Sequence, residues 1–202
     1  MLPETVRAVV EASAGAVHSV AGVGGGDVSS AARVETASGP VFVKWGGSEA
    51  ARTYAAEAEA LAALAEAASD ALAVPTPLAV EVASRELGVL VLPWLERGRP
   101  SPHEWRRFGE ALAELHRAEA PGDGAYGWLD DNWIGSKPQR NGWAETWPVF
   151  FGERRLRAQA ETVRQRGAWD TAWDRRLDRL VARLGDILPE RPPPSLLHGD
   201  LW

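Results

Sequence analysis

The chain of 202 residues contains 45% hydrophobic side chains, enough to form one large domain or two small lobes. Its net charge of -6 argues against nucleic acid as a partner, because phosphate backbones are bound by concentrated basic surfaces. No apolar run of 18 or more residues and no signal peptide pattern is present, so we expect no membrane partner. The absence of cysteine excludes disulfides and thiolate ligands and is compatible with the cytoplasm, the compartment that we expect.

The first ninety residues predict the order helix, strand, strand, helix, strand, strand. Valines at helical spacing open the chain, and alternating apolar residues follow the glycine cluster at 22–26. A run of Ala, Glu and Leu then favours a long helix. We expect helices at residues 3–20 and 49–68, and strands at 28–36, 41–45, 78–83 and 89–92.

The second half of the chain is predicted to be mainly helical. Three prolines make residues 93–102 a connector, and Ser101 and Glu104 form a capping-box pattern at the start of a helix that reaches Leu115. A structured loop is expected at 121–142, and further helices at about 148–166 and 171–186.

Lys44 follows a glycine-rich segment, Gly24, Gly25 and Gly26, on the second strand of the predicted hairpin. Backbone amides of glycines can approach an anion closely, and a lysine supplies the cation that phosphates need. Each half of this pattern also fits a simpler interpretation, namely a flexible surface loop and a solvated strand lysine.

Glu57 lies in the apolar stripe of the second predicted helix, at helical spacing from Leu61 and Leu64, whereas Glu59 should face water. A carboxylate turned toward the core is costly unless it is paired, and Lys44 is the candidate cation. A half-exposed glutamate at the edge of the stripe remains the alternative.

Two further segments could carry chemistry. Pro93, Trp94 and Leu95 could form a hinge where adenine docks against backbone groups, although a buried edge strand that ends at a proline explains the same residues. His198-Gly199-Asp200 follows an apolar strand-like run, and in kinase-like folds an aspartate at this position accepts the proton of the substrate hydroxyl. His198 and Asp200 alone would make a poor metal site, so we expect none.

With these pieces in order, the chain resembles the fructosamine (ketosamine) kinase family, a branch of the aminoglycoside phosphotransferase and choline kinase-like group. The segments that carry the resemblance are distributed over the whole chain. They are residues 25–27, 41–44, 57–61, 74–77, 131–135, 139–143, 150–151, 155–156 and 197–202.

The resemblance implies an α+β, two-lobed protein-kinase-like fold, with an N-lobe of antiparallel sheet plus helix at 1–95 and a partial, mainly helical C-lobe at 96–202. It implies that ATP is the cofactor, that Lys44 holds the α- and β-phosphates, and that Glu57 positions Lys44. Asp200 would be the catalytic base and would contact the substrate, a ketosamine or glycated lysine whose phosphorylation leads to deglycation. Trp133, Trp143 and Trp202 are candidates for the sugar site, although the first two also fit ordinary core or loop anchors.

The sequence departs from the family pattern at its end. The family continues to an asparagine and an aspartate that bind Mg²⁺, and neither can follow Trp202 here. We therefore expect a fragment whose metal ligands lie beyond the chain and which cannot turn over ATP by itself. Alternatives are a kinase of another small alcohol or amine, such as an aminoglycoside, choline or homoserine, and a nucleotide-binding pseudokinase.

Overall fold

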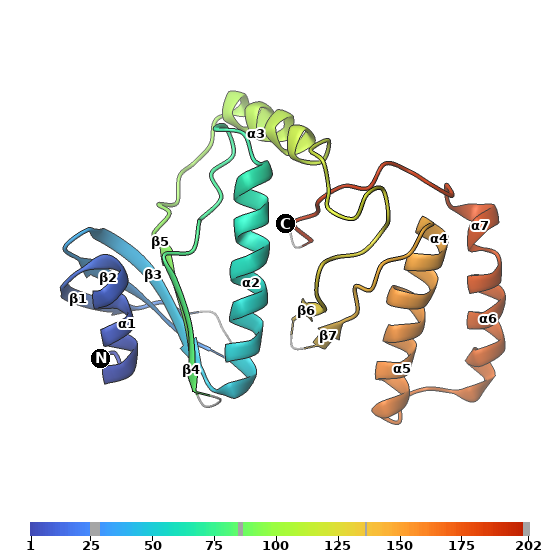
Figure 1. Ribbon diagram of the computed structural model, residues 1–202, viewed down its shortest axis with the longest axis horizontal. Coiled ribbons are helices and arrows are strands. Elements are labelled where there is room, and N and C mark those ends of the chain that lie inside the picture. The colour runs from blue at the N-terminus through green and yellow to red at the C-terminus, as the bar shows by residue number, and fades with distance from the viewer. Residues whose placement is uncertain (25–28, 85–86, 136, 200–202) are drawn as a thin grey trace. The chain divides into compact units, whose positions relative to one another are not determined.

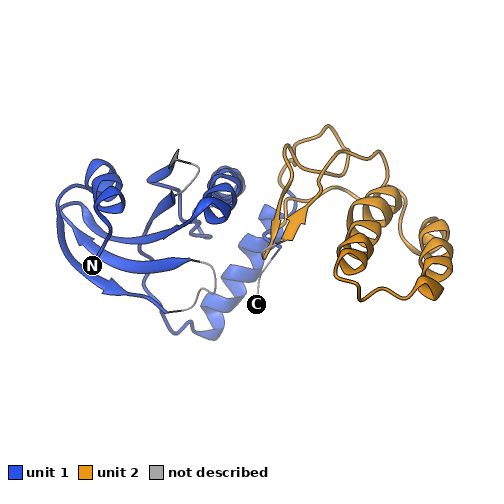
Figure 2. Ribbon diagram, turned by 90° about the horizontal axis from the view of Figure 1, so that it is seen from below, with its two compact units in different colours: residues 1–117, 198–202 blue, residues 118–197 orange. Residues whose placement is uncertain are grey.

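The computed structural model describes residues 1–24, 29–84, 87–135 and 137–199. These form two compact units, and each is described by itself: unit 1 is residues 1–117 with the described part of 198–202, and unit 2 is residues 118–197 (Figure 2). The functional division expected at residue 95 stays a prediction.

Unit 1 is built on a five-stranded antiparallel sheet in the order β1-β2-β3-β5-β4. Its strands are β1 (Val17–Gly22), β2 (Ser30–Thr36), β3 (Gly39–Gly46), β4 (Ala79–Ser84) and β5 (Leu87–Pro93). In the register of the central pair, Lys44 on β3 stands opposite Leu90, and Val41 stands opposite Pro93. The pairing brings the end of β5, about fifty residues further along the chain, beside β3, the strand that carries Lys44.

Two helices cover opposite faces of this sheet, α1 (Glu4–Ala14) and α2 (Ser48–Ala67) (Figure 1). Because side chains alternate along a strand, Val41 and Val43 pack with Val6 and Val10 of α1. Phe42 and Leu90 pack instead with Tyr54 and Ala58 of α2. Lys44, two residues after Phe42, therefore belongs to the face that α2 covers.

The helix predicted at 3–20 is wrong in its second half. The structure ends α1 at Ala14, and Gly15 follows with φ +80, a conformation that suits glycine. Val17 and Val20 then belong to β1 and pack against the sheet core. Their β-branched side chains fit a pleated surface, so tertiary pairing outweighs the helical spacing of the valines.

The helix after the connector is α3 (Pro102–Leu115), and its predicted capping box is confirmed. The Glu104 amide donates to Ser101 Oγ at 3.3 Å, and the Ser101 amide donates to Glu104 Oε2 at 2.6 Å. This reciprocal pair satisfies two amides that the first turn leaves without helical acceptors.

Unit 2 begins with a loop region containing a short hairpin, β6 (Asn132–Ile134) and β7 (Lys137–Gln139), which the sequence interpretation did not contain. One continuous helical segment follows, formed by α4 (Trp147–Val149), the π-helical η1 (Phe150–Arg157) and α5 (Ala158–Gln165). The last elements are the 3₁₀ turn η2 (Thr171–Trp173), α6 (Asp174–Ala182) and α7 (Leu184–Ile187). Across the described ranges, no helix combines the length and the apolar character that crossing a membrane requires.

Candidate functional site

The ion pair expected between strand and helix is present. Lys44 Nζ donates to Glu57 Oε2, and the two side chains are 19% and 38% exposed. The pair forms because Lys44 lies on the α2 face of β3 while Glu57 lies in the stripe that α2 turns toward the sheet. A half-buried ammonium is thus held at one defined place on the sheet, where an anion could reach it.

Glu59 differs from its expectation. The residue is half-buried rather than exposed, and its Oε1 atom is covered without a hydrogen-bond partner. The Ala-rich helix packs over a wider arc than the apolar stripe alone indicates, so a position outside the stripe is partly covered too.

Tyr54 is a residue near this pair that the sequence interpretation missed. It precedes Glu57 by one helical turn, its side chain is buried, and its ring lies 5.0 Å from Lys44 Nζ. The available signal was its spacing of three residues from Glu57, which places both on one face of the helix.

Of the glycines proposed to approach phosphates, only Gly24 lies within the described residues. A Cβ built on Gly24 would meet no atom of the described residues within 4 Å, so contacts with this part of the chain do not require glycine there. Gly25 and Gly26 fall outside the described residues, and the same holds for the catalytic and substrate candidates Asp200 and Trp202.

The hinge candidates lie at the end of β5. Pro93 ends the strand, and the amide of Trp94 donates to the carbonyl of Pro40 at 3.2 Å. The Trp94 ring is covered by Arg33, whose Cζ lies 5.1 Å from the ring centroid, and Leu95 is exposed. Because the Trp94 amide is engaged, a base at this hinge would take its hydrogen bonds from other backbone groups.

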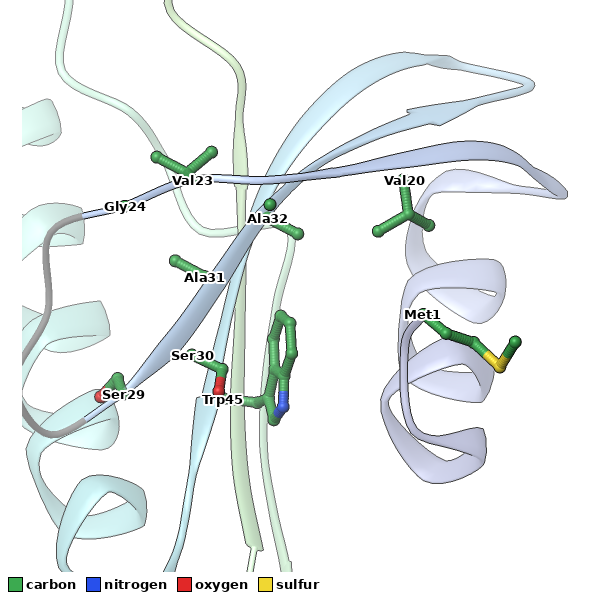
Figure 3. Close-up of a pocket in the computed structure, with 10 residues that line it drawn as sticks. Met1, Val20, Val23, Gly24, Ser29, Ser30, Ala31, Ala32 and Trp45 are labelled. Carbon is green, nitrogen blue, oxygen red and sulfur yellow. The ribbon is translucent and has the colours of Figure 1, made fainter.

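One open pocket of about 400 Å³ lies at the ends of β1 and β2, lined among others by Met1, Gly24, Ser29 and Trp45 (Figure 3). Trp45 packs against the core on the α1 face of the sheet, whereas its neighbour Lys44 faces α2. The lining also includes Ser29, which accepts a hydrogen bond from Tyr54 of α2, but neither Lys44 nor Glu57 lines the pocket. The pocket therefore does not mark the expected phosphate site.

The tryptophans proposed for a sugar site lie in unit 2. Trp133 is on β6 opposite Pro138, and Trp143 follows β7. Trp143 packs so closely that a Cβ added to Gly122 or Gly127 would lie within 2.7 Å of its ring. Within the described part of the chain no ring contact joins the two tryptophans. The Trp143 ring packs against the loop at Gly122 and Gly127, which is a structural role.

A buried polar network holds the loop that contains them. Asn141 is 2% exposed, its amide donates to Asp131 Oδ1 at 2.7 Å, and its side chain donates to the Asp130 carbonyl at 3.1 Å. Arg155 from η1 donates to Asn141 Oδ1 at 2.8 Å and to the Arg140 carbonyl at 2.6 Å. Burial lowers the pKa of the Arg155 guanidinium, and the charge of Asp131 opposes that change.

Metal ligands are the last element to place. In the stretches that the structure describes, no three His, Asp or Glu side chains gather in a way that could hold an ion.

Comparison with solved structures places the fold. Residues of this chain superpose on the aminoglycoside phosphotransferase APH(4)-Ia, crystallised with AMP-PNP and hygromycin B, with a TM-score of 0.61 at 16% identity. The match covers 92% of this chain and 61% of that one, and at this identity it shows the fold alone. The chain thus has the α+β fold of the kinase-like phosphotransferases, as expected from the sequence.

The family is shown by more specific matches. The fructosamine kinase family model matches residues 2–202, so the chain belongs to the fructosamine kinase family. A protein of Thermobifida fusca described as a fructosamine-3-kinase matches with a TM-score of 0.82 and 30% identity, over 98% of this chain and 67% of its own. A protein of Synechocystis sp. described as a ketoamine kinase is 40% identical over 149 residues, which are 72% of this chain and 48% of that protein. The chain spans about half the length of such relatives.

Proposed function

We propose that the protein containing this chain transfers the γ-phosphoryl group of ATP to a hydroxyl of a ketosamine. The observation that carries the proposal is the Lys44–Glu57 ion pair on the α2 face of β3, in a chain that belongs to the fructosamine kinase family. A lysine held by a helix glutamate is the arrangement that phosphate binding requires in kinase-like folds.

The remaining roles follow the same logic. Lys44 holds the α- and β-phosphates, Glu57 orients Lys44, and backbone amides of Gly24, Gly25 and Gly26 lie along the phosphates. Pro93 to Leu95 border the base. When bound, ATP with Mg²⁺ supplies the phosphoryl group and neutralises charge between the β- and γ-phosphates; no residue of this chain is assigned as a metal ligand. The half-buried Lys44 ammonium fits an anionic group of this kind.

Asp200 is proposed to accept the proton of the substrate hydroxyl as its oxygen bonds to phosphorus and the bond to ADP breaks. Trp133, Trp143 and Trp202 are the proposed contacts for the sugar, since indole faces pack against C–H surfaces. The ketosamine class is supported by the family match and by the ketoamine kinase description of the Synechocystis relative. Phosphorylation would destabilise the adduct and release the free amine, and the acidic balance of the chain suits basic substrates such as glycated lysine.

The proposed division of labour sets residues 1–95 as the nucleotide lobe and 96–202 as part of the substrate lobe. The proposed compartment is the cytoplasm, with which the lack of cysteine is compatible.

The test is phosphate transfer by the intact protein to fructosyl-lysine and ribulosyl-lysine, with kanamycin and choline as comparison substrates. We expect a phosphorylated ketosamine that disappears in Asp200→Asn. Turnover of kanamycin or choline alone would move the protein to another small-molecule kinase class, and no turnover of any substrate would favour a nucleotide-binding module without catalysis.

A further inference from the structure

Tyr54 occupies an unusual place for a polar side chain. It is 2% exposed and packs in the α2 face cluster with Ala50, Ala58, Leu90 and Leu92. A phenol this deeply buried needs a partner for its hydroxyl. The hydroxyl has one, because Tyr54 Oη donates to Ser29 Oγ at 2.6 Å.

Ser29 directly precedes β2 and follows residues 25–28, which the structure does not describe (Figure 3). Its partner Tyr54 is 25 positions further along the chain on α2. This hydrogen bond therefore ties the helix that carries Glu57 to the beginning of the strand that follows the glycine-rich segment.

The same side chain also contacts the lysine. Lys44 Nζ lies over the Tyr54 ring at 5.0 Å from its centroid, within the range of a cation–π interaction. The ammonium thus has the Glu57 carboxylate and the face of the Tyr54 ring as neighbours. Both neighbours come from α2 and are three residues apart, which places them one turn from each other.

The protonation state of Tyr54 suits a donor. Burial raises the pKa of its hydroxyl, the nearby Glu57 charge raises it further, and the hydrogen bond to Ser29 partly opposes them. The phenol therefore keeps its proton at neutral pH and continues to donate.

We propose that Tyr54 is a positioning residue of the phosphate site, which fixes the Lys44 ammonium with its ring and fixes the start of β2 with its hydroxyl. This inference rests on the proposed function only in taking Lys44 as the phosphate ligand. Tyr54 itself touches neither nucleotide nor substrate in this proposal. Its effect is to hold three elements, α2, β3 and the beginning of β2, in one arrangement before the nucleotide arrives, so that binding orders less of the protein.

The first experiment measures Lys44 without nucleotide. Amine acetylation of the intact protein is followed by mass spectrometry as the ratio of Lys44 to Lys137, the other lysine of this sequence. Tyr54→Leu uncovers one side of the ammonium, so the ratio should rise about threefold, in line with the strength of an exposed cation–π contact. Tyr54→Phe keeps the ring and should leave the ratio unchanged. An unchanged ratio in Tyr54→Leu would overturn the role of the ring.

The second experiment measures ATP affinity by calorimetry. Tyr54→Phe and Ser29→Ala each remove the same hydrogen bond, so each should weaken ATP binding roughly three- to tenfold, the effect of one hydrogen bond. Because the two changes act through one contact, the double variant should bind no more weakly than either single variant. Equal affinity in all four proteins, or losses that multiply in the double variant, would overturn the tether.

Tyr126→Phe is the matched control. Tyr126 is the other tyrosine of the sequence, is also buried, and donates its hydroxyl to the Pro192 carbonyl within unit 2. Tyr126→Phe should lower the free energy of unfolding while leaving the ATP affinity and the acetylation ratio of Lys44 to Lys137 unchanged. This control distinguishes an effect of Tyr54 on the position of Lys44 from a general loss of stability. If the unsubstituted protein bound no ATP, the proposed function would fall, and the acetylation ratio alone would decide for or against Tyr54.

Discussion

Four of the described hydrogen bonds meet at Asn141, and they connect it to residues 128–131 of the loop in unit 2 and to Arg155 of η1. Its backbone amide donates to the Asp131 carboxylate, and its backbone carbonyl accepts from the Trp128 amide. Its side-chain amide donates to the Asp130 carbonyl, and its side-chain oxygen accepts from Arg155. A buried network of this kind is costly to break in part, because every partner left behind has lost contact with water.

Asn141→Ala should therefore lower the free energy of unfolding by about 2 kcal/mol, since it leaves the Asp130 carbonyl and Arg155 without one partner each. Urea denaturation of the intact protein measures the change. Asn132→Ala is the matched control: it removes a half-buried side-chain bond from Gln139 at 3.0 Å on the hairpin, and its cost should stay below about 1 kcal/mol. Equal losses in the two variants would show that burial at Asn141 is not what matters.

At the scale of single residues, the sequence located the Lys44–Glu57 pair because strand alternation and helix phase are both local properties. Tyr54 was missed for a physical reason, since its partner Ser29 is reached only after β2 and α2 have packed together.

The contact between α2 and β5 depends on the absence of a side chain at Gly88. A Cβ there would lie 2.4 Å from the Cα of Ala51 on α2, a backbone atom that cannot move aside. The helix that carries Glu57 can therefore approach the sheet closely only with glycine at this position.

Gly88→Ala should destabilise the protein by about 1–3 kcal/mol, the usual cost of overpacking, and should loosen α2. Thermal and urea unfolding measure the effect. Gly109→Ala on α3, where a Cβ meets nothing within 4 Å, should instead stabilise by about 0.5–1 kcal/mol, because alanine favours the helix. An unchanged free energy of unfolding in Gly88→Ala would contradict the prediction, because it would mean that α2 can move away from β5 without loss of stability.

The start of α3 should respond to acid. Hydrogen bonds from Ser101 hold the pKa of the Glu104 carboxyl below its usual value. Because the folded pKa is the lower one, the capping contribution is complete above the ordinary carboxyl pKa and is lost as pH falls through the lowered value.

Amide exchange protection in the first turn of α3 should therefore drop at acid pH, after correction for intrinsic exchange rates. In Glu104→Gln, which has no carboxyl to titrate, the protection should be weaker at neutral pH and nearly independent of pH in this range. A parallel fall in both proteins would place the acid response elsewhere.

At the scale of elements, the helix predicted to reach residue 20 failed because spacing alone cannot distinguish the end of a helix from a strand that follows it. Gly15 in a left-handed conformation and the pairing of β1 with β2 decide the matter. The short hairpin β6–β7 was missed because three-residue strands carry almost no periodic signal.

For the whole molecule, the proposed function predicts that ATP stabilises the intact protein. At a concentration about 100 times the Kd, a ligand that binds the folded state alone adds about 2.7 kcal/mol, which a thermal shift assay detects. Lys44→Ala should remove most of this shift, whereas Lys137→Ala, on β7 of unit 2, should retain it. A shift that survives Lys44→Ala would place the phosphates away from this lysine.

The sequence by itself determined the family, the α+β class, the capping box of α3 and the helix phase of Glu57. All of these depend on short motifs and on the spacing of residues close together in the chain. The tertiary structure alone decided which face of the sheet each helix covers, the register that sets Pro93 beside Val41, and the burial of Asn141 against Arg155. These contacts join residues far apart in the chain. Their energies depend on packing and on the exclusion of water, which no local pattern contains.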